Sequence, residues 1–164
     1  MIVTPIGIIL LCVVVLLFIA AFATIRMFNK LTIKKIVSEG KYVDLDEAFI
    51  RRYEALPELL ELVGGGEAVA AEREAAINSA TAEERVGHDK LMAAALKRLL
   101  AEKAESLSSG RGAELADNLY ALEAEIAQKY AAYNAAAKEY ENLRKKPIMK
   151  PVVKFFSFEE KPLF

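Results

Sequence analysis

The first 25 residues carry no charged side chain, and this feature constrains the chain more than any other. All 22 basic and 23 acidic residues lie at or beyond Arg26, and the run from Ile2 to Ile25 is almost wholly apolar. A helix rises about 1.5 Å per residue, so this run reaches roughly 36 Å, against a hydrocarbon core of about 30 Å. The sequence therefore predicts a transmembrane anchor over residues 1–25.

A cleaved signal peptide is the main alternative to a permanent anchor. Ala21-Phe22-Ala23 has the small-x-small form that signal peptidase reads, and cleavage after Ala23 would release a periplasmic helical module. However, no basic residue precedes the apolar run, which also exceeds the roughly 7–15 apolar residues of a signal peptide. Cys12 follows two leucines rather than small residues, so it is interpreted as a small hydrophobe in the bilayer.

Positive charge follows the apolar run directly. Residues 26–43 are predicted to form a basic linker beside the membrane, because residues 26–41 carry a net charge of +4. The positive-inside rule then places the body of the chain in the cytoplasm. The basic residues are Arg26, Lys30, Lys34, Lys35 and Lys41, and the one acid is Glu39.

The body of the chain is rich in helix-forming residues. Residues 42–146 contain 24 alanines in 105 positions and a single proline, and they lack alternating β-branched or aromatic runs. The fold class predicted for the body is therefore all-α. One cysteine and one histidine in the whole chain exclude a disulfide framework and argue against a metal centre or a catalytic triad.

Three long helical stretches can be placed in residues 44–146. The first runs from about residue 44 to 63, begins at Asp44 as an N-cap, and is predicted to kink or break at Pro57. The second covers residues 67–107, as one helix or as two, because Thr81 and Glu84 have the form of a capping box. Leucines are predicted to line its later half: Leu91, Leu96, Leu99, Leu100 and Leu107.

The third stretch, residues 113–146, has the clearest periodicity. Its apolar residues step by three or four, which is near the heptad spacing of a coiled coil. Its tyrosines are interpreted as core or bundle-edge residues, and the predicted architecture is an antiparallel three- or four-helix bundle. The seam consists of Leu115, Leu119, Leu122, Ile126, Tyr130, Tyr133, Ala137 and Tyr140.

Residues 147–164 form a basic and aromatic tail, since Pro147 ends the helical pattern. Charge is segregated along the chain: residues 42–143 have a net charge of −9, whereas residues 144–164 have a net charge of +4. The acidic body and the absence of a basic groove argue against binding to nucleic acid.

Three segments of the chain resemble the LemA family of bacterial membrane-anchored helical proteins. Residues 51–63, RRYEALPELLELV, are similar to a family segment with the same Arg-Arg pair and proline, although Glu58 replaces the family asparagine. Tyr133-Asn134 followed by Tyr140 resembles a second family segment, and residues 156–164, FSFEEKPLF, resemble the family's terminal segment. The resemblance implies a single-pass protein of the bacterial inner membrane with a helical bundle and no established enzymatic activity.

Catalysis has little support in the residues themselves. His88-Asp89 is the only adjacent histidine–acid pair, and neighbours on a helix point about 100° apart, so His88 is interpreted as a solvated surface residue. The glycine runs at 64–66 and 110–112 lack the lysine and hydroxyl residue of a phosphate loop. We therefore expect no catalytic residue, no cofactor and no metal ligand.

Candidate contact residues come from the basic segments and the tail. The lysines beside the anchor either bind anionic lipid or only set topology. The tail either lies in the membrane interface, docks on a partner, or caps the core of the bundle itself. Arg51 and Arg52 either hold a partner or pair with acids of the bundle. The candidates are Lys30, Lys34, Lys35, Arg51, Arg52, Lys150, Lys154, Phe155, Phe156 and Phe158.

Two hypotheses for function follow, besides the released periplasmic module. The first is a non-enzymatic membrane-tethered scaffold or adaptor that presents the helical bundle to a protein partner of unknown identity. The second is a membrane-organising protein that acts on anionic lipid through the basic segments. Self-association of the chain is compatible with both.

Overall fold

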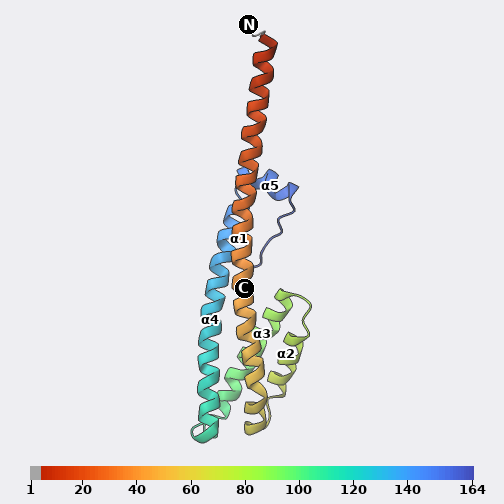
Figure 1. Ribbon diagram of the computed structural model, residues 1–164. Coiled ribbons are helices and arrows are strands. Elements are labelled where there is room, and N and C mark those ends of the chain that lie inside the picture. The colour runs from red at the N-terminus through yellow and green to blue at the C-terminus, as the bar shows by residue number, and fades with distance from the viewer. Residues whose placement is uncertain (1–4) are drawn as a thin grey trace. The chain divides into compact units, whose positions relative to one another are not determined.

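The computed structural model describes residues 5–164 and is all-α over that range (Figure 1). Residues 1–4, the first of the predicted anchor, lie outside the described residues. The body therefore has the helical fold class predicted from the sequence. The elements are α1 (Pro5–Val63), α2 (Glu67–Ile77), α3 (Ala82–Glu102), α4 (Gly110–Arg144), the 3-10 turn η1 (Pro147–Met149) and α5 (Lys150–Phe155).

Helix α1 continues from the apolar segment into the body over 59 residues. The prediction that a helix begins at Asp44 is therefore wrong, because residues 26–43 already belong to α1. The inward-facing stripe of the helix starts earlier: Leu31, Ser38 and Leu45 recur every seven residues, and each is 0% exposed. Seven residues are close to two helical turns, so these three positions share one face of a single helix.

Of the kink or break predicted at Pro57, the break does not occur, because α1 passes through this residue. A proline inside a helix removes one backbone hydrogen bond and crowds the preceding turn, at a cost of about 3 kcal/mol. Pro57 itself is exposed, whereas its neighbours Leu56 and Leu59 are both 0% exposed. Burial of the leucines on either side offsets the missing hydrogen bond and keeps the helix continuous.

Residues 67–107 form two helices, which confirms the second of the two alternatives. The hydroxyl of Thr81 accepts a hydrogen bond from the Glu84 backbone N–H at 3.2 Å, and the Glu84 carboxylate accepts one from the Thr81 N–H at 3.3 Å. This is the capping box predicted from the sequence. Before α2, Gly66 has a φ of 89°, and a Cβ atom there would lie 2.6 Å from Leu60 Cδ2, so glycine is required.

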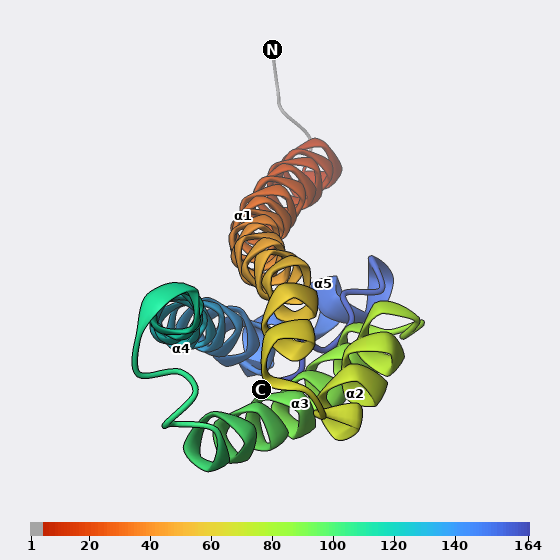
Figure 2. The same cartoon turned by 90° about the horizontal axis from the view of Figure 1, so that it is seen from below.

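The chain divides into two compact units, each with its own core. Unit 2 comprises Gly40–Ala135 and Pro162–Phe164. Within it the chain reverses direction from one helix to the next, so the later part of α1, then α2, α3 and the first part of α4 form an antiparallel four-helix bundle (Figure 2). Its buried residues include Leu45, Phe49, Leu56, Leu59, Met92, Leu96, Leu119 and Ile126.

Unit 1 comprises Met1–Glu39 and Ala136–Lys161. As predicted, α4 ends shortly before Pro147, but the following tail is partly helical because it contains η1 and α5. Its core is a second, smaller cluster that joins α1, the end of α4, α5 and the segment after α5. The buried residues are Leu31, Tyr140, Leu143, Met149, Val152 and Phe158, with Met27, Phe28 and Val153 packed against them.

Candidate functional site

The apolar segment of α1 is exposed along its described length. It belongs to the one helix, among residues 5–164, that is long and apolar enough to cross a membrane, and its most apolar window has no buried residue. Phe18 is 73% exposed and Leu16 is 65% exposed. Apolar side chains in such a continuous exposed run are typical of a surface that contacts lipid or another protein. The segment is thus a candidate membrane anchor.

Helix α5 lies beside the end of this apolar segment, within unit 1 (Figure 1). The ring of Phe28 on α1 lies 4.7 Å from the ring of Phe156 and 5.7 Å from the ring of Phe158, measured between centroids. A hollow of about 280 Å³ lies between Thr24 and α5, and Phe155 lines it. The tail therefore packs on the first residues that follow the predicted span.

The aromatic residues of the tail differ in their exposure, so no single predicted role fits all of them. Phe158 is 9% exposed and belongs to the core of unit 1, so it caps the protein's own core. Phe155 is 81% exposed and Phe156 is 42% exposed. Only these two aromatic side chains of the tail are free to contact a membrane or a partner.

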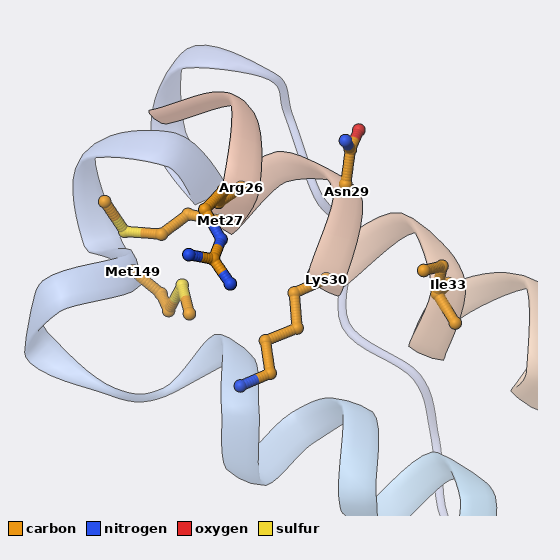
Figure 3. Close-up of a pocket in the computed structure, with 6 residues that line it drawn as sticks. All are labelled: Arg26, Met27, Asn29, Lys30, Ile33 and Met149. Atoms are coloured by element: carbon orange, nitrogen blue, oxygen red, sulfur yellow. The ribbon is translucent and has the colours of Figure 1, made fainter. Parts of the chain in front are cut away.

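A cavity of about 520 Å³ opens beside α1, just after the apolar segment (Figure 3). Arg26 and Lys30 lie one helical turn apart and extend toward the side where Met149 lies, whereas Asn29 points away (Figure 3). The Arg26 guanidinium also lies 5.8 Å from the centre of the Phe22 ring. The cavity combines two cations with apolar walls, and its lining residues are Arg26, Met27, Asn29, Lys30, Ile33 and Met149.

The other predicted lysines differ in their surroundings. Lys34 forms an ion pair with Glu139, and the Lys35 ammonium lies 3.8 Å from the Glu39 carboxylate, so both have acidic neighbours within unit 1. Lys150 on α5 and Lys154 at its end are exposed. Of the three predicted lysines beside the anchor, Lys30 alone lines the cavity.

The predicted role of Arg52 as a surface contact is wrong, because its side chain is 0% exposed. Its guanidinium donates hydrogen bonds to the carboxylates of Asp89 on α3 and Glu123 on α4. Arg51 is half-exposed and pairs with Glu125 on α4. Both arginines therefore pair with acidic residues of the bundle, which was the second of the two roles predicted for them.

Asp89 is a structural residue that the sequence analysis missed. It lies three residues after Val86 and three before Met92, and all three side chains are buried. A carboxylate on an apolar helical stripe was the available signal, because a charge there needs a partner. The hydroxyl of Tyr53 donates a further hydrogen bond to Asp89 at 3.0 Å.

Burial and charge have opposing effects on the pKa values of this cluster. Burial alone would lower the pKa of Arg52, but the charges of Asp89 and Glu123 outweigh it and raise that pKa. Burial also raises the pKa of the Asp89 carboxyl, against the opposing effect of Arg52 and Tyr53. With both charged side chains closed to water, the geometry indicates a structural ion pair that holds helices together.

His88 was predicted to be a solvated surface residue, and it is partly so. Its side chain is 40% exposed, and its Nδ1 atom lies 2.7 Å from the Glu72 carboxylate on α2. The pair joins α2 to α3 within unit 2. Within residues 5–164, no group of three or more His, Cys, Asp or Glu side chains is placed to hold a metal ion.

A groove between α3 and α4 was also missed by the sequence analysis. It has a volume of about 400 Å³, and Leu96 and Leu100, which are 1% and 5% exposed, form part of its lining. Leu91, predicted to line the seam, is instead 56% exposed because it lies on the outer side of α3. The groove is lined by Ala93, Ala94, Leu96, Lys97, Leu100, Tyr120 and Glu123.

The two later segments that suggested the family are joined by hydrogen bonds. In unit 2, the Asn134 side chain donates to the Phe164 carbonyl at 2.6 Å and accepts from its N–H at 2.9 Å. The Tyr133 hydroxyl donates to the Pro162 carbonyl at 2.8 Å. In unit 1, the Tyr140 hydroxyl donates to the Glu159 carbonyl at 2.7 Å. The tyrosines and the asparagine of α4 thus hold the terminal segment along the helix.

The LemA family model matches residues 41–164, which includes the Arg-Arg segment, the tyrosine segment of α4 and the terminal segment. No curated protein matches the chain. Because the family match covers well over half of the sequence, the chain belongs to the LemA family.

Proposed function

We propose that this protein is a non-enzymatic adaptor of the bacterial inner membrane, which holds a protein partner against unit 2 on the cytoplasmic side. The observation that carries the proposal is the open groove between α3 and α4, whose lining is mainly apolar in an otherwise acidic body. An exposed apolar depression with a polar edge is typical of a surface that binds another protein.

The chemistry of the groove favours a short amphipathic helix as the partner segment. Leu96 and Leu100 offer a floor for apolar side chains, and the alanines at 93 and 94 leave room for close approach. Lys97 is exposed at the edge, whereas Glu123 is engaged by Arg52. The segment that fits carries apolar residues at helical spacing and an acidic side chain opposite Lys97.

The anchor supports this function by restricting the search to the membrane. Two molecules held on the same membrane meet at a much higher effective concentration than in solution, so a modest affinity suffices. The basic residues that follow the span favour a cytoplasmic body by the positive-inside rule.

Site-specific photocrosslinking of the tagged full-length protein in intact cells tests the proposal. A photoreactive amino acid at Ala94 lies in the groove, and one at the exposed Gln128 on α4 serves as the control position. We expect a discrete crosslinked partner from position 94 and none from position 128. Lys97→Glu should abolish the product, whereas Arg98→Glu, the same change outside the groove, should leave it.

Other outcomes would overturn the adaptor function. Equal products from both positions, or a product that Lys97→Glu does not weaken, would show that the groove is not the binding surface. A product that contains only this chain would show self-association instead. The amino-terminal sequence of the mature protein completes the test, because a start after Ala23 would indicate a released module without a tether.

A further inference from the structure

The cavity beside the anchor has features that protein binding does not require. It lies on α1 directly after the apolar segment, and it holds two cations of the same helix face, Arg26 and Lys30 (Figure 3). We propose that this cavity binds the phosphate-containing headgroup of an anionic membrane lipid, and that Phe155 inserts among the acyl chains beside it. The lipid is thus a ligand at a defined site, separate from the groove of unit 2.

The depth of the cavity in the membrane follows from the length of the span. About 20 helical residues cross the hydrocarbon core, so residues 5–25 of α1 are sufficient. Arg26 is the first charged residue after them and therefore lies at the level of the lipid headgroups. Lys30 lies one turn further on, within reach of the same phosphate, because residues i and i+4 share a helix face.

The electrostatics of this end of unit 1 favour an anion. Residues 1–38 and 142–158 contain no acidic residue, but they contain nine basic ones. Lys34 and Lys35 have acidic neighbours, whereas neither Arg26 nor Lys30 has an ion-pair partner within residues 5–164. Two unpaired cations beside an apolar wall match a phosphate that carries an acyl chain.

The apolar part of the site supplies the argument for lipid over free phosphate. Met27, Ile33 and Met149 line the cavity together with the cations. In the neighbouring hollow, Phe155 on α5 lies across from Thr24, a residue of the apolar run, and is 81% exposed. An exposed aromatic ring at the level where the span ends is typical of a side chain in the membrane interface. A free phosphate has no apolar part that could contact these side chains.

Native mass spectrometry of the full-length protein in mild detergent tests the binding site. Phosphatidylglycerol and phosphatidylcholine with the same acyl chains are the probes. We expect one phosphatidylglycerol molecule to bind at least tenfold more tightly than phosphatidylcholine. The double variant Arg26→Gln/Lys30→Gln should lose this preference, whereas Lys150→Gln/Lys154→Gln, which removes the same charge outside the cavity, should change it less than threefold.

Two kinds of result would contradict the proposed lipid site. Equal affinity for the two lipids, or an unchanged preference in Arg26→Gln/Lys30→Gln, would overturn the site. Competition by millimolar inorganic phosphate as effective as by the lipid would show a free phosphate site instead. Circular dichroism of each variant, compared with the original protein, shows whether a loss of binding reflects loss of the helical fold.

Fluorescence tests the insertion of Phe155, because the chain contains no tryptophan. Phe155→Trp places a single reporter on α5, and Tyr120→Trp places a matched reporter on the exposed face of unit 2. In phosphatidylglycerol vesicles with brominated acyl chains, we expect quenching of at least half of the emission at position 155 and little at position 120. Absence of quenching at position 155 would overturn the insertion.

Discussion

Arg52 on α1 and Asp89 on α3 form an ion pair that is closed to water, with 0% and 2% of their side chains exposed. Removing two charges from water is unfavourable, so such a pair adds little to stability compared with two apolar side chains. Its geometry, however, fits only one alignment of α1 with α3. The pair therefore favours one register of α1 against α3 within this alanine-rich bundle.

Breaking this pair should be strongly destabilising. Arg52→Met leaves the Asp89 carboxylate buried, with only Tyr53 to donate to it, and should lower the free energy of unfolding by about 3–5 kcal/mol. Urea unfolding of the full-length protein in detergent, followed by circular dichroism, measures the change.

Two further variants separate the charge from the packing. The double variant Arg52→Met/Asp89→Leu removes both buried charges and should recover most of the lost stability, since the remaining partner of Arg52, Glu123, is 33% exposed and reaches water. Arg51→Met disrupts the exposed pair with Glu125 and should leave the unfolding midpoint unchanged. If the double variant were as unstable as Arg52→Met, lost packing rather than a stranded charge would be the cause.

The terminal segment should loosen in acid because of Glu141. Burial raises the pKa of this carboxyl, but hydrogen bonds from Arg144 and from the Lys161 N–H outweigh burial, and the net pKa lies below its ordinary value of 4.5. A pKa that is lower in the folded state stabilises the fold above the unfolded pKa, and this contribution is lost as the pH falls through the folded pKa.

Stability between pH 6 and pH 3 measures this contribution. The original protein should lose stability below about pH 4.5, and Glu141→Gln should lose less over the same range, since it has no proton to take up. Asp117→Asn, at an exposed position of the same helix, is the matched control and should alter the pH profile less than Glu141→Gln does. Identical pH profiles for all three proteins would contradict the role of Glu141.

The sequence was informative where a local pattern decides the structure. The apolar run, the Thr81 capping box and the seam of α4 depend on residues close in the chain, so their periodicity and spacing were sufficient. The predicted helix start at Asp44 was wrong because the buried stripe of α1 already includes Leu31 and Ser38. Helix continuity depended on that stripe, whose packing partners are remote in sequence.

The candidate sites were less predictable because they are made by contacts between distant segments. Arg52 is 37 residues from Asp89, and no local pattern joins them. The cavity beside the apolar segment brings Arg26 together with Met149, and the groove of unit 2 brings Leu96 together with Tyr120. The sequence states which side chains are charged or aromatic, but it does not show which of them are exposed in the fold.

Asn134 should be needed to hold the terminal segment. Its amide both donates to and accepts from the backbone of Phe164, so Asn134→Leu leaves two backbone groups without partners. We expect a loss of about 1–3 kcal/mol, together with faster hydrogen exchange in residues 158–164. Hydrogen exchange followed by mass spectrometry measures both. Asn142→Leu, at an exposed position of the same helix, should leave the exchange unchanged.

Thr81 should contribute to stability through its cap on α3. Thr81→Ala removes the acceptor for the Glu84 N–H and should lower the free energy of unfolding by about 1 kcal/mol. Thr81→Ser keeps the acceptor and should retain most of the stability. If both variants were equally destabilised, the methyl group rather than the capping hydrogen bond would be responsible.

Substitution by alanine should affect stability at one aromatic residue of the tail and not at another. Phe158 is buried in the core of unit 1, so Phe158→Ala leaves a cavity and should lower the free energy of unfolding by about 3 kcal/mol. Phe155→Ala removes an exposed ring and should change the stability by no more than about 0.5 kcal/mol. Thermal unfolding in detergent compares the two variants directly. Equal destabilisation would mean that Phe155 also packs into the core, and it would then be unavailable to the membrane.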